Sequence, residues 1–305
     1  MIIEKYKKGK IMVYHVDKNI SDEQMKNLMN TYVNPNQIDF ILDHDADVYT
    51  KDGQLLLKFR TNVLNNTKMN EFYDNIIDFA KRETSNRGST SGSNTKNVGQ
   101  NPKIMTNIFG YFDKLAPKQK MLVRNSGKKV MPVRQCRFNM DYPEKYKKTI
   151  PLLKEIDILY KELVPESYNR QRKKANQTHF KIEGTSFTTV TTNINFRTTI
   201  HTDKGDDDEG FGNLTVIEKG DYTGGETCLP QYGIGVNVRT GDILFMDVHE
   251  PHGNLPIHGK KDQFIRLSVV CYLRRNLWLK TKNKTKKFLI QHNKTIKNLR
   301  TKKIK

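Results

Sequence analysis

Apolar residues recur with two different periods along the chain. Over residues 143–175 they recur at helical spacing and Pro165 interrupts the pattern, which predicts two successive helices. Past residue 178 the pattern changes to short β-rich runs separated by Gly or Asp. We expect strands at 179–182, 187–196, 214–217, 235–238, 243–246 and 264–272. Helices followed by short strands predict an α+β protein whose antiparallel sandwich or barrel is backed by helices.

The first third of the chain mixes helical and strand signals. A capping-box pattern at Ser21–Gln24 precedes a helix that is expected to reach about Val33. Asp52-Gly53 predicts a tight hairpin turn between two apolar runs, and a second helix is expected over 70–82. Residues 1–83 are therefore interpreted as an N-terminal α/β extension.

Composition marks the remaining boundaries. Residues 84–101 are Ser, Thr, Asn or Gly at 14 of 18 positions, so we expect a flexible loop over 84–102. From Arg274 to Lys305 the chain has 13 Lys or Arg and no Asp or Glu. The chain thus divides into the N-terminal extension, this loop, a domain over 103–273 and a basic tail over 274–305.

The charge of the chain indicates the class of its partner. The 53 basic and 33 acidic residues give a net charge of +20, of which the tail supplies +13. Such a concentration of positive charge typically binds a polyanion such as DNA, RNA or an anionic membrane. We expect a nucleic acid, and DNA in particular; a solubilising or addressing role for the tail is the alternative.

Hydropathy and cysteine usage indicate the compartment. No stretch approaches the roughly 20 apolar residues of a membrane helix, and the first residues lack the apolar core of a signal peptide. Cys136, Cys228 and Cys271 are odd in number and have no metal-type spacing. We therefore expect an intracellular protein of a reducing compartment with no membrane partner, in the nucleus or associated with viral DNA.

The sharpest chemical signal is His201-Thr-Asp203. It follows an alternating run over 191–200, and positions two apart on a strand face the same way, so an imidazole and a carboxylate would project together. His252 follows a second apolar strand, 49 residues after Asp203. Two His and one carboxylate on one face of a metal leave three positions open. Non-haem Fe(II) oxygenases use this facial arrangement for a co-substrate and O₂.

Other interpretations of these residues remain open at this point. His201 alone could be an ordinary strand-end histidine and Asp203 a turn residue. His249 is the rival third ligand, but the Gly253-Asn254 pair that follows His252 permits a close backbone approach and favours His252. Asp247 is interpreted as a structural residue at a strand end.

A candidate co-substrate anchor follows on the last predicted strand. Arg266 lies 14 residues after His252, and strand alternation places Ser268 on the same face. A guanidinium that grips a carboxylate at two points, beside a hydroxyl, suits the distal end of a dicarboxylate. The residues together therefore predict an iron centre that uses 2-oxoglutarate.

At these residues the sequence resembles the TET/JBP family of Fe(II)/2-oxoglutarate dioxygenases, which oxidise 5-methyl groups of thymine and 5-methylcytosine in nucleic acid. It is similar above all to the trypanosome thymine hydroxylase branch and its viral and fungal relatives, over about residues 178–273. The matching segments are His201-Thr-Asp-Lys-Gly-Asp206, Gly212-Asn-Leu-Thr-Val216, Tyr222-Thr-Gly-Gly-Glu226, Gly241–Asp247, His252-Gly-Asn254 and Arg266–Tyr272.

The resemblance implies a double-stranded β-helix core (jelly-roll, cupin-like) and a division of roles among the candidate residues. It implies His201, Asp203 and His252 as Fe(II) ligands. It implies Arg266, with Ser268, as the site for the 2-oxoglutarate carboxylate, with O₂ as the second substrate.

Two further assignments rest on the same resemblance. Arg197 would help to hold the co-substrate, and the alternative is a surface or salt-bridge role. Asp206 would approach the base edge, and the alternative is a solvated acidic loop over 206–209. The glycines Gly224 and Gly225 match a turn that recurs in the family.

The implied reaction couples oxidative decarboxylation of 2-oxoglutarate to hydroxylation of a pyrimidine 5-methyl group. A prolyl or lysyl protein hydroxylase is the alternative enzyme, because it would use the same iron and co-substrate residues; the basic tail and the resemblance favour nucleic acid. A non-catalytic nucleic-acid-binding relic of the barrel is the other alternative. It is disfavoured because no ligand position has been lost.

Overall fold

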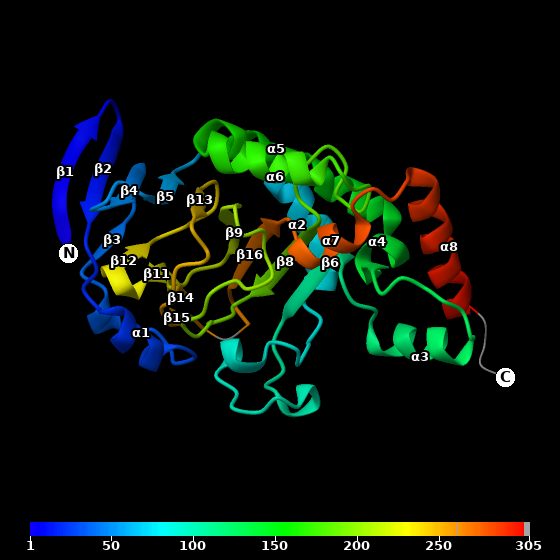
Figure 1. Ribbon diagram of the computed structural model, residues 1–305. Helices are drawn as coiled ribbons and strands as arrows, with labels where there is room; N and C mark the ends of the chain where they lie inside the picture. The colour runs from blue at the N-terminus through cyan, green and yellow to red at the C-terminus, as the bar shows by residue number, and fades with distance from the viewer. Residues whose placement is uncertain (261, 302–305) are drawn as a thin grey trace. The chain divides into compact units, whose positions relative to one another are not determined.

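The computed structural model describes residues 1–260 and 262–301, which form two compact units (Figure 1). The first unit comprises residues 1–107, 191–204 and 211–270. The second comprises residues 108–190, 205–210 and the chain from 271 onward. The last four residues of the expected basic tail, 302–305, lie outside the described residues. Among the described helices none is both long and apolar enough to cross a membrane.

The first unit is built mainly from strands. Its elements are β1 (Ile2–Lys8), β2 (Ile11–Val16), α1 (Asp22–Leu28), β3 (Phe40–Leu42), β4 (Ala46–Thr50), β5 (Leu55–Arg60), α2 (Asn66–Ala80), β9 (Gly212–Lys219), β10 (Thr223–Gly224), β11 (Thr227–Leu229), β12 (Ile234–Val236), β13 (Ile243–Met246), β14 (Gly253–Asn254) and β15 (Ile257–His258). Short 3₁₀ turns lie at Pro35–Gln37, Gly88–Ser91, Val98–Gln100 and Pro230–Tyr232. Strands β6 (Thr106–Phe112), β8 (Thr189–Ile194) and β16 (Ile265–Tyr272) have residues in both units.

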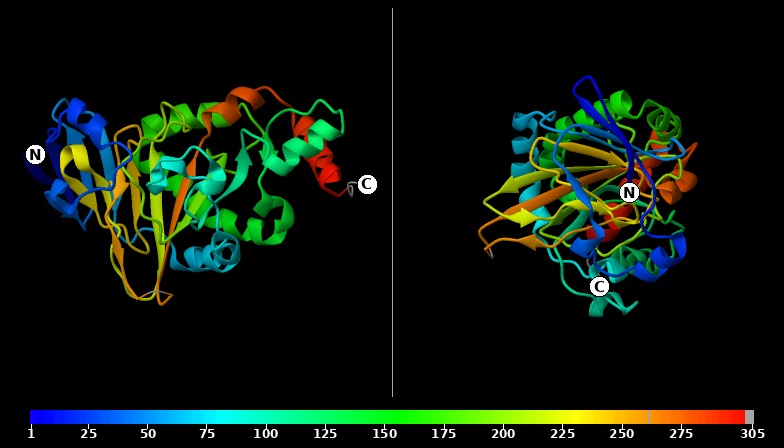
Figure 2. Two further views of the ribbon diagram at one scale, coloured as in Figure 1. Left: turned by 90° about the horizontal axis from the view of Figure 1, so that it is seen from below. Right: turned by 90° about the vertical axis from the view of Figure 1, so that its left-hand side faces the viewer.

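Two sheets of the first unit share one apolar core. The larger has the order β1-β2-β4-β5-β13-β9-β16-β8, with the β1–β2 hairpin at its edge (blue in Figures 1 and 2), and the smaller has the order β14-β11-β12-β3. Val48, Phe59 and Leu244 of the larger sheet pack in one buried cluster with Leu229 and Val236 of the smaller. Two mostly antiparallel sheets that enclose a common core form the sandwich expected of a jelly roll.

Helix α1 begins as the sequence predicts but ends early. Both bonds of the Ser21–Gln24 capping box are present. The helix stops at Leu28 rather than near Val33, because Asn30 takes a positive φ of 67°. The Asn30 N–H donates to the Ile200 carbonyl and the Ile200 N–H donates to the Thr31 carbonyl, both at 2.8 Å. The chain thus leaves the helix to pair with the residue that directly precedes the His201 motif.

The predicted hairpin and second helix are both present. Strands β4 and β5 pair antiparallel across a turn in which Gly53 has a φ of 80°. Helix α2 begins at Asn66, four residues earlier than expected, because the Asn65 side chain caps it by accepting the Lys68 N–H at 3.1 Å. Its apolar face is buried.

The Ser/Thr/Asn/Gly-rich segment is tied to the approach to the candidate site. The Thr199 N–H donates to the Thr90 carbonyl at 3.1 Å, and the Thr199 hydroxyl donates to the Ser89 carbonyl at 2.9 Å. The Tyr32 hydroxyl donates to the Ser91 carbonyl at 3.2 Å. The segment around residues 88–91 therefore braces the chain just before His201.

One predicted strand is absent and its neighbour is shorter. Residues 179–182 form no strand, because the chain reverses between Ile182 and Phe187: the Ile182 N–H donates to the Phe187 carbonyl at 2.9 Å, with Gly184 at a φ of 77°. The strand expected at 187–196 is β8, Thr189–Ile194. The expected strands over 214–217, 235–238, 243–246 and 264–272 correspond to β9, β12, β13 and β16.

The second unit is mainly helical. Its elements are α3 (Pro117–Asn125), β7 (Arg134–Gln135), α4 (Arg137–Asp141), α5 (Pro143–Leu163), α6 (Pro165–Ala175), α7 (Arg275–Thr281) and α8 (Lys286–Thr301). The predicted helical stretch and its break are confirmed, since α5 ends at Leu163 and Pro165 opens α6. The described part of the basic tail is folded: α8 buries His292, Ile296 and Leu299.

Candidate metal centre and co-substrate site

The chain reaches the predicted metal site from β8, which ends at Ile194. Asn195 ends the strand because its backbone takes a positive φ of 48°, which is uncommon outside glycine. Its N–H donates to the Arg266 carbonyl at 3.1 Å, and its side-chain oxygen accepts the Arg266 N–H at 2.7 Å. The expected continuous strand over 191–200 is therefore wrong, and Asn195 instead fixes the backbone of Arg266.

His201 and His252 are joined through their backbones. Each N–H donates to the carbonyl of the other residue at 2.9 Å, which forms an isolated antiparallel bridge. The centroids of the two imidazole rings are 4.5 Å apart. The Asp203 N–H donates to the Val248 carbonyl at 3.0 Å. Backbone pairing between distant segments thus brings the two imidazoles and the carboxylate together.

Hydrogen bonds to carbonyls set the tautomer of both rings in their neutral form. His201 Nδ1 lies 2.7 Å from the Thr199 carbonyl oxygen, and His252 Nδ1 lies 2.9 Å from the Glu250 carbonyl oxygen. A carbonyl only accepts, so each Nδ1 carries a proton, and in the neutral ring Nε2 holds the lone pair. This is the orientation that metal-ligating histidines adopt.

The three lone-pair-bearing groups converge. His201 Nε2 is 3.7 Å from Asp203 Oδ1, and His252 Nε2 is 3.9 Å from Asp203 Oδ2. In the described part of the chain these three side chains are the one group whose potential ligand atoms all lie within 4.8 Å of one another. Ligand atoms about 2.0–2.2 Å from a single ion lie roughly 3–4 Å apart. Two imidazole nitrogens and one carboxylate therefore fit one divalent metal of the non-haem Fe(II) type.

The electrostatics of the site keep the His201 ring ready for a metal. Burial and the neighbouring His252 ring lower the pKa of His201 to about 4, although the Asp203 carboxylate opposes the shift. The His201 ring is therefore neutral at physiological pH, and no proton competes for its Nε2.

His249, the rival ligand, lies elsewhere. It is exposed, and its Nδ1 lies 2.9 Å from Asp247 Oδ1, which also accepts the His249 N–H at 3.0 Å. Asp247 thus serves a local turn at the end of β13.

Arg266 is buried without a matching anion. The residue is 5% exposed, and no carboxylate in the described residues lies within 4.0 Å of its guanidinium nitrogens. Burial lowers the pKa of Arg266. A Cβ on Gly225 would lie 3.0 Å from Arg266 Nε, and Gly225 has a φ of 79°, so only glycine fits beside this guanidinium. A buried guanidinium without a carboxylate partner is chemically suited to receive a carboxylate ligand.

Tyr222 and Arg239 form the surroundings of the guanidinium. The Tyr222 ring stacks on Phe264 with centroids 5.4 Å apart, and the Arg239 guanidinium lies over the Tyr222 ring at 4.7 Å from its centroid. Arg239 pairs with Glu218 at 3.1 Å. The Tyr222 hydroxyl is buried and makes no hydrogen bond of full geometry among the described residues, although Glu218, Arg239 and Arg266 lie near it. Burial raises the pKa of Tyr222 to about 12, although the Arg266 charge opposes the shift, so the hydroxyl keeps its proton and can donate it.

Ser268 lies two residues beyond Arg266 on β16. Strand pairing with β9 sets Arg266 opposite Glu218 and Ser268 opposite Val216. The Ser268 hydroxyl accepts a hydrogen bond from the Asn193 amide at 3.2 Å. Its hydrogen therefore remains available for another acceptor.

Comparison with known proteins identifies the domain that contains these residues. The Tet_JBP family, described as the oxygenase domain of the 2OGFeDO superfamily, matches residues 124–275. Residues 124–275 belong to the Tet/JBP oxygenase family. This confirms the resemblance stated from the sequence motifs, and the superfamily generally uses Fe(II), 2-oxoglutarate and O₂.

Relatives of this Tet/JBP domain occur within much longer proteins. The bifunctional helicase and thymine dioxygenase JBP2 of Leishmania infantum is 40% identical over 127 residues, which are 42% of this chain and 11% of that protein. The thymine dioxygenase JBP1 of Trypanosoma brucei brucei is 29% identical over 204 residues, which are 66% of this chain and 22% of that protein. The chain therefore spans only a small part of these relatives.

A solved structure shares the fold of this chain. NgTET1 in complex with 5mC DNA matches with a TM-score of 0.53 and 16% identity, covering 83% of this chain and 86% of that chain. The expected α+β class with a double-stranded β-helix core is confirmed.

Arg197 has partners of its own within the first unit. One guanidinium nitrogen donates to the Val33 carbonyl at 3.0 Å, and the group lies over the Tyr32 ring at 4.4 Å from its centroid. Its buried Nε has no hydrogen-bond partner among the described residues. These contacts link the approach to His201 with the segment that follows α1.

Asp206 belongs to the second unit, where its backbone forms an isolated antiparallel β-bridge with the backbone of Arg274. The acidic run that it begins is not simply a solvated loop. Asp207 is 2% exposed and pairs with Lys174 at 2.5 Å, which also pairs with Glu209 at 2.5 Å. The sequence could not show that basic residues of α6 and α7 neutralise this run.

Sequence reasoning gave no role to Tyr222, Asn195 or Asn193. Tyr222 stands in the matching segment Tyr222–Glu226, beside the two glycines that were interpreted only as a turn. Its position two residues before Gly224 was the one signal that it lies near the co-substrate anchor. The two asparagines carry no such signal, because their importance comes from contacts with Arg266 and Ser268 on a distant strand.

Proposed function

We propose that this chain is an Fe(II)- and 2-oxoglutarate-dependent dioxygenase that hydroxylates the 5-methyl group of thymine or 5-methylcytosine in DNA. The observation that carries the proposal is the convergence of His201, Asp203 and His252 within 4.8 Å, in a chain that contains a Tet/JBP oxygenase domain. The names of the relatives, a thymine dioxygenase and a TET protein bound to 5mC DNA, support the substrate class. A DNA substrate would place the protein in the nucleus or beside viral DNA.

The residues divide the work of the proposed reaction. His201, Asp203 and His252 would hold Fe(II), and two neutral imidazoles with one carboxylate would leave a positive charge for an anionic co-substrate. Iron with 2-oxoglutarate and O₂ supplies, when bound, an oxidant able to hydroxylate a methyl group. Arg266 would bind the distal carboxylate of 2-oxoglutarate in a buried setting, and Ser268, held by Asn193, would donate a further hydrogen bond.

The target base must leave the duplex to reach a buried centre, which costs a few kcal/mol. Contacts between basic side chains and phosphates would offset this cost and make binding salt-dependent. The roles of Arg197 in co-substrate binding and of Asp206 at the base edge remain predictions.

Succinate formation tests the proposal directly. Fe(II)-loaded protein would be given 2-oxoglutarate and air with thymine-containing DNA, 5-methylcytosine-containing DNA or a peptide rich in Pro and Lys. We expect one DNA to stimulate turnover and its nucleosides to gain one oxygen by mass spectrometry. Stimulation by the peptide alone would instead establish a protein hydroxylase.

Tyr222→Phe is expected to weaken 2-oxoglutarate binding by about 2- to 10-fold and to change kcat by less than about twofold, because one neutral hydrogen bond contributes about 0.5–1.5 kcal/mol. The phenyl ring retains the stacking on Phe264, so the fold should be unaffected. The measurement is KM for 2-oxoglutarate from succinate formation. Tyr6→Phe, on the exposed strand β1, is the matched control. An unchanged KM in Tyr222→Phe would show that the buried hydroxyl does not contact the co-substrate.

A further inference from the structure

Two acid-free segments of the sequence meet in the second unit. From Lys114 to Met140 the chain has eight Lys or Arg and no Asp or Glu, and the same absence extends from Arg274 to Lys305. The first segment contains α3 and the second contains α8, and these two helices pack against each other. Neither segment takes part in the candidate iron and co-substrate site, which lies in the first unit.

The packing of α8 decides which of its faces is free. His292 Nε2 lies 3.0 Å from the Val133 carbonyl, and its ring stacks on Phe288 with centroids 5.9 Å apart. Ile296 and Leu299 are buried on the same side. The apolar face of α8 is thus occupied within the protein, which leaves its lysines exposed. An amphipathic helix that binds a membrane would instead need that apolar face free.

Most exposed basic side chains of α3, of the loop after it and of α8 have no carboxylate partner. Arg300 of α8 is an exception, because it pairs with Asp141 at 2.9 Å. The exposed residues of this region that form no ion pair within 4.0 Å in the described chain include Lys118, Lys120, Arg124, Lys128, Lys129, Lys287, Lys294 and Lys297. So much exposed and unneutralised positive charge on two adjacent helices is typical of a surface that binds a polyanion.

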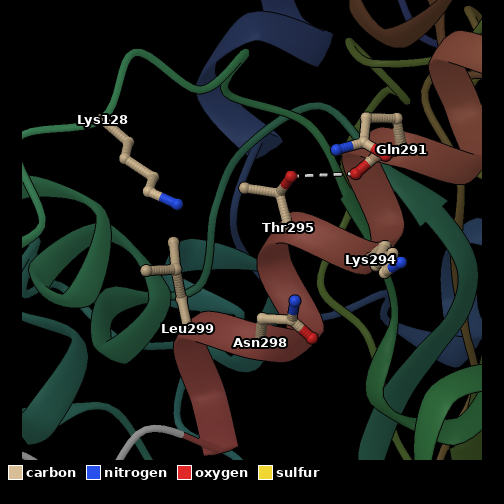
Figure 3. Close-up of a pocket in the computed structure, with 6 residues that line it drawn as sticks. All are labelled: Lys128, Gln291, Lys294, Thr295, Asn298 and Leu299. Carbon is tan, nitrogen blue, oxygen red and sulfur yellow. Dashed lines mark hydrogen bonds between the residues drawn. The ribbon is translucent and has the colours of Figure 1, made fainter.

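A groove of about 200 Å³ lies within this surface (Figure 3). Lys128 extends from the loop after α3 toward Thr295, and Lys294 stands on the same helix. The complete lining is Lys128, Gln291, Lys294, Thr295, Asn298 and Leu299. Two ammonium groups, two amides and a hydroxyl are the groups that proteins use to contact backbone phosphates, and no acidic side chain lines the groove.

We propose that α3, the loop through Lys129 and α8 form a second DNA-contacting surface, separate from the catalytic site. This basic surface binds phosphates of the duplex backbone without regard to sequence, and the groove between Lys128 and α8 receives one of them. The inference extends the proposed function, from which it takes DNA as the polyanion. It assigns to the folded tail the task of holding the duplex while the first unit acts on a base.

Binding to a duplex made only of G·C pairs tests the surface independently of catalysis, because such DNA contains neither thymine nor 5-methylcytosine. The measurement is fluorescence anisotropy between 50 and 200 mM salt, without iron or 2-oxoglutarate. Removing three phosphate contacts in Lys128→Gln/Lys294→Gln/Lys297→Gln should raise Kd at least about tenfold and reduce the slope of log K against log salt by about 3. Replacement of the same lysines by arginine should preserve binding.

Matched controls distinguish the loss of this surface from a general loss of positive charge or of the folded structure. Lys5→Gln/Lys7→Gln/Lys8→Gln removes the same charge from the exposed strand β1 and should leave Kd within about twofold. His252→Ala should bind G·C duplex normally even where turnover is lost, so failure of the proposed reaction would not mimic failure of this surface. An equal loss of affinity for the G·C duplex in both triple variants would overturn the inference. Binding of phosphatidylserine vesicles but not of duplex would also overturn it and would assign the surface to a membrane.

Discussion

His252→Ala is expected to lower Fe(II) affinity by at least about 100-fold and to reduce 2-oxoglutarate turnover below about 1% of the unmodified protein. Loss of a residue that merely orients a metal ligand already costs about 10–100-fold, and His252 is proposed as a ligand itself. Its Nε2 is one of three donors that face one point, so alanine leaves a two-donor site. The measurements are Fe(II) binding by anaerobic titration and succinate formation under air.

His249→Ala supplies the matched control for this experiment. His249 lies three residues earlier, is exposed and pairs with Asp247, so its loss should leave iron affinity and turnover nearly unchanged. The reverse outcome, with iron lost from His249→Ala and kept by His252→Ala, would show that the ligand assignment is wrong. The unfolding temperature without metal must be compared as well, because the His252 ring also donates to the Glu250 carbonyl.

The features that sequence predicts well here depend on neighbours along the chain. Pro165 separates α5 from α6 because a proline suits the first turn of a helix and not its interior. The capping box of Ser21 and Gln24 involves residues that lie within four positions of each other in the sequence. These signals survive folding because the groups that interact are already close in sequence.

The errors arise where a distant segment decides the local backbone. Asn195 ends β8 because its backbone and side chain pair with Arg266, 71 residues away. Helix α1 stops at Leu28 because the next residues pair with Ile200. His201 and Asp203 still come together despite the lost strand, because His201 pairs with His252 and Asp203 with Val248. Strand alternation therefore selected residues that do lie together, but through a geometry that the chain does not adopt.

In the basic tail the high content of Lys and Arg obscured an amphipathic helical pattern. The charge of the tail predicted a polyanion partner, but its apolar residues were not interpreted as a helix. Phe288, His292, Ile296 and Leu299 recur at spacings of four, four and three residues, as the face of an amphipathic helix does. In the structure these positions face the interior of the second unit or its edge. The apolar pattern positions the helix, and the charge then appears on its outer side.

Arg266→Met should abolish measurable 2-oxoglutarate binding without destabilising the protein. A guanidinium can make two charge-assisted hydrogen bonds to a carboxylate, each contributing about 1.5–3 kcal/mol, so their loss should raise Kd for 2-oxoglutarate by about 10²- to 10⁴-fold. Methionine retains much of the apolar stem. Arg266→Lys keeps the charge but not the two-point geometry. Its Kd for 2-oxoglutarate should therefore lie between those of the unmodified protein and of Arg266→Met.

Stability distinguishes a ligand-binding role from a structural one. Arg266 is buried, burial lowers its pKa although the Glu218 carboxylate opposes the shift, and it forms no ion pair within 4.0 Å in the described chain. Such a charge destabilises the folded state until an anion binds. The unfolding temperature of Arg266→Met without ligand should therefore equal or exceed that of the unmodified protein. Added 2-oxoglutarate should raise the unfolding temperature of the unmodified protein alone. A large loss of stability in Arg266→Met would mean that the guanidinium supports the fold, and that the co-substrate carboxylate is held elsewhere.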